Sequence, residues 1–326
     1  MVVGGGQPLR PGHRVVEEPR RDAVTRTLIV RLQGGSGNQL FQYAAGLALA
    51  EKWAAQPVWL RRGAVGIPLA ELVGGDLSDV SPLALERAGM GPHLSAQFTS
   101  GARRALTDKV VSRGRRRLAV GSGRAVSIVQ PSARAFSPQI DTPPDRATDI
   151  YLEGYFQNPQ HFGPTLTQVA DQVAAQLIEP DDAHIGSGAT VVSFRRGDYI
   201  PLGWDLPLAY YERALAALPP VDGPVWAIAD DQVTAHFALH WLRSLGLRAE
   251  PPPDLGVKPV IRDLRLLMAA ERVVMANSTL CWWGTTVGDR VAAATTRVVL
   301  APSPWLPIAE AAALLQPSWQ VVDSNP

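Results

Sequence analysis

The chain has 326 residues, of which 46% are hydrophobic, and a formal net charge of +1. This length accommodates two domains, and the balanced charge argues against a general nucleic-acid or membrane-surface binder, because such proteins usually carry a strong basic excess. One cysteine and six scattered histidines exclude an intrachain disulfide framework and provide no metal-ligand spacing. We therefore expect a reducing compartment and no metal.

Residues 1–26 are polar and contain several Gly, Pro and Arg residues without an apolar period, which predicts a disordered leader. This segment lacks the apolar core of a signal peptide. No run of the chain approaches the roughly 18 consecutive apolar residues of a membrane helix. These features favour a cytoplasmic protein.

Residues 27–32 predict a buried strand, the following glycines a turn, and residues 38–55 a helix rich in Ala and Leu. The turn lies in the run Gly-Gly-Ser-Gly-Asn-Gln-Leu-Phe-Gln-Tyr at 34–43, the first of three motifs. Gly35 and Gly37 would let the backbone approach a phosphate or a sugar hydroxyl at the start of the helix. An ordinary turn explains the glycines equally well, because the run matches neither the dinucleotide fingerprint nor a P-loop.

The stretch 61–148 is less legible, since Pro, Gly and Ser recur and basic residues cluster between Arg103 and Arg117. A solvated basic face is the simpler interpretation of this cluster. The functional alternative is contact with an anionic surface or acceptor, including peripheral association with the inner face of a membrane.

From Asp149 onward, strands alternate with helices. The pattern predicts strands at 150–153, 189–194, 224–229, 272–276 and 297–301, and helices at 163–178, 208–217, 231–243 and 261–271. Such alternation predicts parallel βαβ units. The Pro- and Asp-rich stretch 179–188 indicates a boundary, so we expect domains at 27–182 and 183–326.

The second motif is Ser-Phe-Arg-Arg-Gly-Asp-Tyr at 193–199, which follows the predicted strand 189–194. Arg195 and Arg196 offer planar forks suited to phosphate oxygens at the carboxyl end of that strand. Asp198 could hold such a fork or accept a hydroxyl proton. A solvated turn of Arg and Asp is the alternative.

The third motif is Asn-Ser-Thr-Leu-Cys-Trp-Trp-Gly at 277–284, which follows the strand 272–276. Asn277, Ser278 and Thr279 are typical of a helix N-cap, and their hydroxyls with the free N–H groups could cradle an anion. The adjacent Trp282 and Trp283 indicate core packing more often than a platform for a sugar ring, and we expect them to wall the cleft.

Three further carboxylates lie at strand ends or helix starts. Asp230 and Asp231 end the strand 224–229, and Asp263 begins the helix before the third motif. A carboxylate can accept two N–H bonds from a guanine edge. Helix capping is the alternative function for each of them.

Taken in order, the three motifs resemble glycosyltransferase family 11, the α-1,2-fucosyltransferases. The resemblance extends to Gly-Tyr-Phe-Gln at 154–157, to Asp230-Asp231 and to Asp263-Leu264, and it covers about residues 27–305. It implies an α/β protein of GT-B-like architecture, with two Rossmann-like domains facing a cleft. It also implies an inverting transfer of fucose from GDP-fucose to the 2-hydroxyl of a galactose-type acceptor, without a catalytic metal.

The resemblance also implies residue roles. Arg195 would hold the β-phosphate and neutralise the charge that develops as GDP leaves, with Arg196 in support. Asp263 would bind guanine, with Asp230 as the second candidate. The other implied donor contacts are Asn277, Ser278 and Thr279, and Asn38 and Gln39 from the first domain. The base is not among these implied roles: Asp198 is the first candidate, and Asp205 and Glu153 are alternatives between which neither the spacing nor the resemblance decides. An Asp198 held by an arginine would be a poor base, because cations lower the pKa of a carboxylate.

One position departs from the family pattern. The chain has Ser193 where the family motif opens with His, so a hydrogen bond from an imidazole to the donor is shortened or lost. This departure favours one alternative, a related transferase that uses a different nucleotide sugar. A second alternative, a non-catalytic glycan-binding relative, would apply if the Arg-Arg-Gly-Asp segment does not bind a nucleotide. The acceptor glycan and the oligomeric state do not follow from the sequence.

Overall fold

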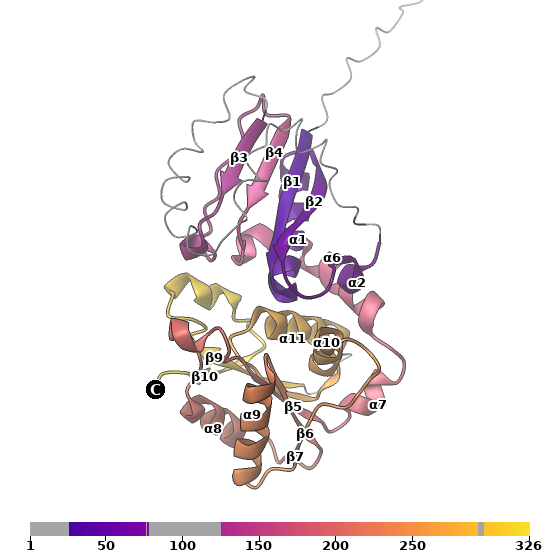
Figure 1. The fold of residues 1–326 in the computed structure, drawn as a ribbon, viewed down its shortest axis with the longest axis vertical. Helices are drawn as coiled ribbons and strands as arrows, with labels where there is room; N and C mark the ends of the chain where they lie inside the picture. The colour runs from indigo at the N-terminus through magenta and orange to yellow at the C-terminus, as the bar shows by residue number, and fades with distance from the viewer. Residues whose placement is uncertain (1–25, 76, 78–124, 293–296) are drawn as a thin grey trace, which may run out of the picture.

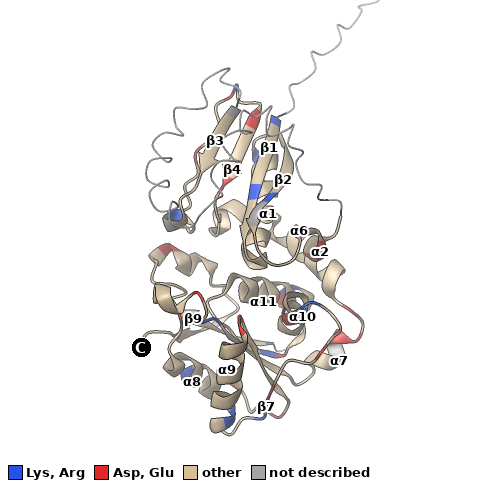
Figure 2. Ribbon diagram, in the orientation of Figure 1, with Lys and Arg blue, Asp and Glu red and all other residues tan. Residues whose placement is uncertain are grey.

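The computed structural model describes residues 26–75, 77, 125–292 and 297–326. These residues form two α/β halves, each built on a parallel sheet (Figure 1). Charged residues are spread over both halves (Figure 2). The expected leader at 1–26, apart from Arg26, and the basic cluster between Arg103 and Arg117 lie outside the described residues.

The N-terminal half contains a four-stranded sheet in the order β2-β1-β4-β3. Its strands are β1 (Arg26–Gly34), β2 (Ala55–Ala64), β3 (Ala125–Val129) and β4 (Asp149–Glu153). Alternate residues of β1 point to opposite faces, and Leu28, Val30 and Leu32 are buried in the core with α1 (Ser36–Lys52) and α6 (Pro159–Leu177). The half also contains the short α2 (Ala70–Val73) and the 3₁₀ turn η1 (Ser132–Arg134).

The C-terminal half contains a six-stranded sheet in the order β10-β9-β8-β5-β6-β7. Its strands are β5 (Thr190–Phe194), β6 (Val225–Ala229), β7 (Ala249–Glu250), β8 (Arg272–Val274), β9 (Val298–Ser303) and β10 (Gln320–Asp323). Numbered from β5, this is the 3-2-1-4-5-6 order of a Rossmann fold, and the strand order reverses between β5 and β8. Ligands of such sheets bind outside the carboxyl ends of the strands at that reversal.

The helices of the C-terminal half are α7 (Asp182–Gly186), α8 (Leu208–Ala217), α9 (Gln232–Ser244), α10 (Pro259–Ala269) and α11 (Thr279–Val291). Two 3₁₀ turns, η2 (Ile200–Leu202) and η3 (Ala309–Leu314), follow β5 and β9. No described helix is long and apolar enough to cross a membrane.

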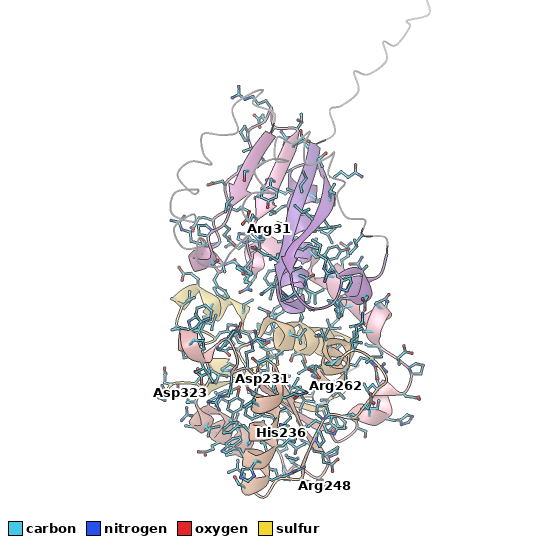
Figure 3. The ribbon with its side chains drawn as sticks, viewed as in Figure 1. Arg31, Asp231, His236, Arg248, Arg262 and Asp323 are labelled. Atoms are coloured by element: carbon cyan, nitrogen blue, oxygen red, sulfur yellow. The ribbon has the colours of Figure 1, made fainter. Side chains whose placement is uncertain are left out.

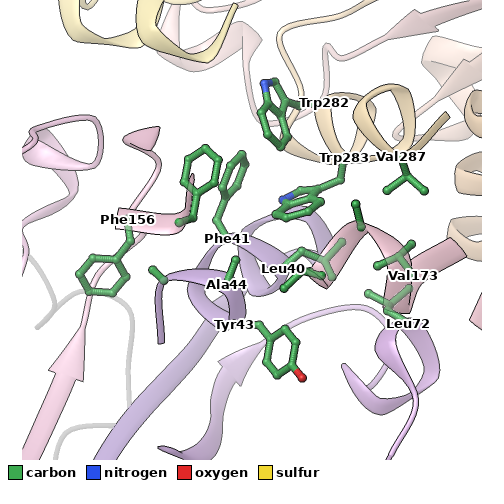
Figure 4. Packing of buried hydrophobic residues seen from close by; sticks show 14 of the residues in the cluster. Leu40, Phe41, Tyr43, Ala44, Leu72, Phe156, Val173, Trp282, Trp283 and Val287 are labelled. Atoms are coloured by element: carbon green, nitrogen blue, oxygen red, sulfur yellow. The ribbon is translucent and has the colours of Figure 1, made fainter. Parts of the chain in front are cut away.

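An aromatic cluster joins the two halves. Phe41 of α1 contacts Trp282 and Trp283 of α11, with ring centroids 4.9 and 5.3 Å away (Figure 4). Phe162 of α6 contacts Trp282 with a centroid distance of 5.5 Å. All four rings are essentially inaccessible to solvent. The prediction that Trp282 and Trp283 wall the cleft is therefore wrong, since packing against the other half encloses both of them.

The predicted fold class, α/β with two Rossmann-like halves in a GT-B-like arrangement, is confirmed. The six predicted strands correspond to β1, β4, β5, β6, β8 and β9, with small shifts at their ends. The sheets are separated by residues 178–189, which include α7. The division into domains at 182/183 stays a prediction.

Candidate functional site

The second and third motifs meet where the strand order of the C-terminal sheet reverses. β5 ends at Phe194 and is followed by Arg195 and Arg196, while β8 leads into Asn277 and Ser278. Because β5 and β8 are paired parallel strands, their carboxyl ends lie at the same edge of the sheet. The two motifs are therefore brought together as the strand pattern predicts.

Arg195 is held by groups on three sides. Its Nη2 lies 2.8 Å from Oδ1 of Asp198, its Nε lies 3.6 Å from Oδ2 of Asp230, and its guanidinium lies 5.1 Å from the centre of the Tyr199 ring. The Arg195 side chain remains 32% exposed, so part of the cation is open to a ligand. Two carboxylates and a ring thus fix an accessible guanidinium, which is the form suited to phosphate binding.

Arg196 projects to a different set of partners. Its Nε lies 3.8 Å from Oδ2 of Asp205, and its guanidinium lies 4.7 Å from the centre of the Phe237 ring on α9. Its backbone N–H donates to Oδ1 of Asp230 at 3.2 Å. Arg196 therefore links the segment after β5 with α9 and with the loop at Asp205.

Asp230 contacts residues 195–197, the arginine turn that follows β5. Besides its contacts with Arg195 and Arg196, it lies beside Gly197, where an added Cβ would be 2.8 Å from its Oδ2. With both oxygens turned to the arginine segment, Asp230 is placed to orient the two arginines, and its contact with guanine stays a prediction. Sequence reasoning missed this partnership because the two segments are 34 residues apart.

Asp231 behaves as the capping alternative predicts. It is the N-cap of α9, and its oxygens accept from the N–H of Thr234 at 2.8 Å and from the hydroxyl of Thr234 at 2.9 Å. These hydrogen bonds, the backbone one first, lower the pKa of the Asp231 carboxyl.

Asn277 fixes the loop after η2. Its Nδ2 donates to the carbonyl of Trp204 at 2.8 Å, and its own carbonyl accepts from the hydroxyl of Tyr199 at 3.3 Å. Asn277 is 2% exposed, and its Oδ1 has no partner within the described structure. Burial raises the pKa of Tyr199 to about 12, so this phenol stays protonated as a donor. The sequence pattern does not indicate this role of Tyr199, although Tyr199 is the last residue of the second motif.

Ser278 and Thr279 lie at the start of α11. Ser278 is the N-cap and makes no side-chain capping hydrogen bond, and both residues are half-buried. The first N–H groups of α11 therefore lack the usual side-chain acceptor. A helix start of this kind favours an anion.

The first motif packs directly on the third. An added Cβ on Gly37 would lie 2.4 Å from the backbone nitrogen of Leu280 and 2.5 Å from the carbonyl carbon of Thr279. Only a glycine permits this approach of α1 to α11. At Gly35, by contrast, an added Cβ would meet nothing within 4 Å. Gly37 thus serves the junction of the two halves, while Gly35 leaves space at the start of α1.

Asn38 and Gln39 differ in accessibility. Asn38 is partly exposed, and its Oδ1 accepts from Nε2 of Gln157 at 2.7 Å. Gln39 is fully buried, and its Nε2 donates to the carbonyls of Gly34 and Val65. The prediction that Gln39 lines the cleft is therefore corrected, because its buried amide bridges the end of β1 and the residue that follows β2.

Asp263 lies within α10 and is 8% exposed. Arg262 donates to its Oδ1 from Nη2 at 2.7 Å and from Nε at 3.0 Å. Burial raises the pKa of this carboxyl, and Arg262 only partly offsets the effect. Figure 3 shows Arg262 and Asp231 in the C-terminal half.

Ser193 packs against α11. It lies on β5, is 5% exposed, and forms a side-chain hydrogen bond with Cys281 of α11. Burial raises the pKa of the Cys281 thiol to about 11. The residue that departs from the family pattern is thus part of the packing between β5 and α11.

The three candidate bases all contact cations. Asp198 pairs with Arg195 at 2.8 Å and Asp205 with Arg196 at 3.8 Å. Glu153 pairs with Arg31 at 2.6 Å and accepts from the hydroxyl of Tyr151 at 3.2 Å. Among the described residues, no group of three or more His, Cys, Asp or Glu side chains could hold a metal ion.

No protein-family model matches the chain, and no curated protein sequence is similar to it. Similar solved structures include the fucosyltransferase NodZ from Bradyrhizobium, at 14% identity and a TM-score of 0.46 over 80% of this chain and 93% of that one. Another is NodZ α-1,6-fucosyltransferase co-crystallised with GDP, at 15% identity and a TM-score of 0.42 over 80% and 92%.

A third similar structure is a mutant of Arabidopsis thaliana FUT1 in complex with GDP. It has 12% identity and a TM-score of 0.46 over 84% of this chain and 71% of that one.

Proposed function

We propose that the chain is an inverting glycosyltransferase that moves fucose from GDP-fucose to the 2-hydroxyl of a galactose-type acceptor. The observation that carries this proposal is that the three motifs of the sequence lie together, at the start of α11 and the carboxyl ends of β5 and β8. Gly37 of the first packs on Thr279 and Leu280 of the third, and Arg195 of the second lies beside the same strand ends.

The charge pattern of the junction supports binding of a diphosphate. Arg195 is fixed by Asp198 and Asp230 yet remains 32% exposed, and α11 begins without a side-chain cap. A guanidinium and a helix start therefore offer donors to phosphate oxygens at adjacent strand ends. Asp263, a buried carboxylate with a raised pKa, is the proposed guanine contact.

In the proposed reaction, the acceptor hydroxyl oxygen forms a bond to C1 of fucose. The bond from C1 to the β-phosphate oxygen breaks, its electron pair leaves with GDP, and the hydroxyl proton passes to a carboxylate. Arg195 stabilises the charge that develops on the phosphate. Asp198 is the first proposed base. The alternatives are Asp205, which lies farther from its arginine, at 3.8 Å from Nε of Arg196 against 2.8 Å for Asp198 and Arg195, and Glu153.

GDP release from GDP-fucose, measured with and without lactose in EDTA, tests this proposal. Lactose-stimulated release is the expected result. Titration with GDP separates the alternatives, because a non-catalytic glycan-binding protein would not bind GDP. Ser193 suggests a different sugar donor, and a comparison of turnover with GDP-fucose and with GDP-mannose tests this alternative. Faster turnover of GDP-mannose would show that fucose is not the preferred donor sugar.

Substitution of the arginine tests the mechanism. Arg195→Ala should lower kcat by about 100-fold or more, because a phosphate contact made in the transition state contributes several kcal/mol. Arg248→Ala is the matched control, since Arg248 is 81% exposed at the far end of the same half (Figure 3). Turnover by Arg195→Ala within a few-fold of the parent would contradict the mechanism. Asp198→Asn with parent-like kcat would move the base to Asp205 or Glu153.

A further inference from the structure

A cavity lies between the two halves. It has a volume of about 440 Å³, which lies within the usual range for small-ligand sites. Its lining residues come from the segment after β3 and from the connection between β9 and β10: Arg134, Phe136, Ser137, Gln139, Ile308 and Glu310. The cavity therefore needs both halves to exist.

The N-terminal wall of this cavity is hydrogen-bonded to the segment that follows β4. The carbonyl of Phe136 accepts from Nδ2 of Asn158 at 2.8 Å, and the carbonyl of Ala135 accepts from the N–H of Gln157 at 2.8 Å. Gln157 in turn donates to Asn38 of the first motif. Hydrogen bonds thus connect this wall to the proposed donor site.

The C-terminal wall is anchored on the interface between the halves. Ile308 and Glu310 lie at the start of η3, and the carbonyl of Leu314 at the end of η3 accepts from Nε1 of Trp282 at 2.7 Å. The strand before η3, β9, pairs with β8, which leads to Asn277. Both walls are therefore fixed relative to the proposed site of reaction.

The lining chemistry suits a hydroxyl-rich and uncharged ligand. Arg134 and Glu310 carry opposite charges on opposite walls, both are exposed, and among the described contacts no ion pair joins them. The hydroxyl of Ser137 donates to Oε1 of Gln139 at 2.8 Å, so Nε2 of Gln139 is the group of this pair that can donate to a ligand, and Phe136 adds an aromatic ring to the lining. Charged and amide groups can hydrogen-bond sugar hydroxyls, while the balance of one cation and one anion favours no net ligand charge.

We infer that this cavity binds the acceptor, a neutral galactose-containing glycan, with Arg134, Gln139 and Glu310 as its specificity-determining residues. This inference rests on the proposed transferase function. It places acceptor recognition on both halves, whereas the donor contacts lie mainly on the C-terminal half.

The test uses full-length protein with Arg134→Ala, Gln139→Ala and Glu310→Gln. Each variant should have a KM for lactose about tenfold or more above that of the parent, because the loss of one hydrogen bond to a charged or amide group weakens binding by about a factor of ten. The kcat at saturating lactose and the affinity for GDP should stay near those of the parent. The matched controls are Arg248→Ala and Glu212→Gln, which change exposed residues elsewhere. Lactose KM values within twofold of the parent in all three variants would overturn the inference.

A failure of the proposed function would look different. If the parent binds no GDP and releases none from GDP-fucose, the transferase proposal fails, and the cavity is then tested by saturation-transfer NMR with neutral galactose-containing oligosaccharides, lactose among them. Signals that the parent gives and that Arg134→Ala and Glu310→Gln lose would support the cavity as a glycan site. Absence of binding by the parent, or unchanged signals in the variants, would overturn it.

Discussion

At the scale of single residues, Asp263 stands out because its burial is unfavourable. The carboxyl is 8% exposed, and burial raises its pKa even though Arg262 donates two hydrogen bonds to it. A buried carboxylate that remains imperfectly compensated lowers stability when it is ionised. Such a cost is expected at a residue retained for binding.

Asp263→Asn should therefore gain stability relative to the parent as pH rises. In the parent, the pKa of Asp263 is higher in the folded state than the value of about 3.9 in the unfolded chain. The contribution of Asp263 to the free energy of unfolding is therefore fully present below about pH 3.9, and it is lost as pH rises through the pKa of the folded state. Asn does not titrate, so the variant does not lose stability in this way. The free energy of unfolding of the variant minus that of the parent should therefore increase between about pH 4 and pH 7. Urea unfolding across this range measures the difference.

Asp231→Asn is the matched control with the opposite sign. Hydrogen bonds from Thr234 lower the pKa of Asp231, so its contribution is present above about pH 3.9 and is lost as pH falls through its folded value. The Asn variant should thus be less stable than the parent at pH 7 and approach it in acid. Because this group is largely exposed, the change should stay below about 1 kcal/mol. Parallel pH curves for the two variants would contradict both assignments.

At the scale of elements, the approach of α1 to α11 depends on one glycine. Gly37→Ala should destabilise the protein by about 1–3 kcal/mol or more, because the new Cβ would lie 2.4 Å from the backbone nitrogen of Leu280 and backbone cannot move aside as a side chain can. Gly35→Ala is the control, since its Cβ would meet nothing within 4 Å and its φ of −72° suits alanine. Chemical denaturation of both variants measures the contrast.

Equal stabilities for the two glycine variants would show that α1 and α11 do not meet as closely as described. Loss of GDP binding in Gly35→Ala with unchanged stability would instead indicate that the space beside Gly35 receives the donor. The pair of variants thus separates packing at Gly37 from ligand approach at Gly35.

The strands that the sequence predicts are those with neighbours on both sides. β1, β4, β5, β6, β8 and β9 are interior strands whose apolar runs are legible. The strands it missed are the edges of the two described sheets, β2, β3, β7 and β10. Edge strands are partly solvated and tolerate Pro and charge, as in β2 with Pro57 and Arg61, or are very short, as in β7.

The candidate site was partly predictable for a related reason. Residues after interior strands, such as Arg195 and Asn277, could be placed at one edge of the sheet from the strand pattern alone. The partnership of Asp230 with the arginine turn and the burial of Gln39 depend on contacts between distant segments. No local pattern carries that information, so these two roles required the structure.

At the scale of the whole molecule, the two halves share one core. Phe41 and Phe162 from the N-terminal half enclose Trp282 and Trp283 from the C-terminal half (Figure 4). Exposed ion pairs flank this cluster, Arg290 with Asp171 and Lys258 with Glu71. Large apolar interfaces couple domains, whereas exposed ion pairs contribute little.

Phe162→Ala should therefore weaken both halves, although Phe162 belongs to α6 of the N-terminal half. Removal of this buried ring should lower the free energy of unfolding by about 3–5 kcal/mol. Hydrogen exchange followed by mass spectrometry should show faster exchange in peptides of β1 and equally in peptides of β5, because loss of the shared core exposes Trp282 and Trp283 as well.

Asp171→Asn is the matched control at the rim of the same interface. It breaks the exposed pair with Arg290 and should leave exchange in both sheets close to that of the parent, with any small effect vanishing in high salt. If Phe162→Ala speeds exchange in β1 peptides but leaves β5 peptides protected, the halves unfold independently and the aromatic cluster does not couple them. Equal effects on β1 and β5 would mean that the donor contacts of one half and the acceptor cavity between the halves belong to a single cooperative unit.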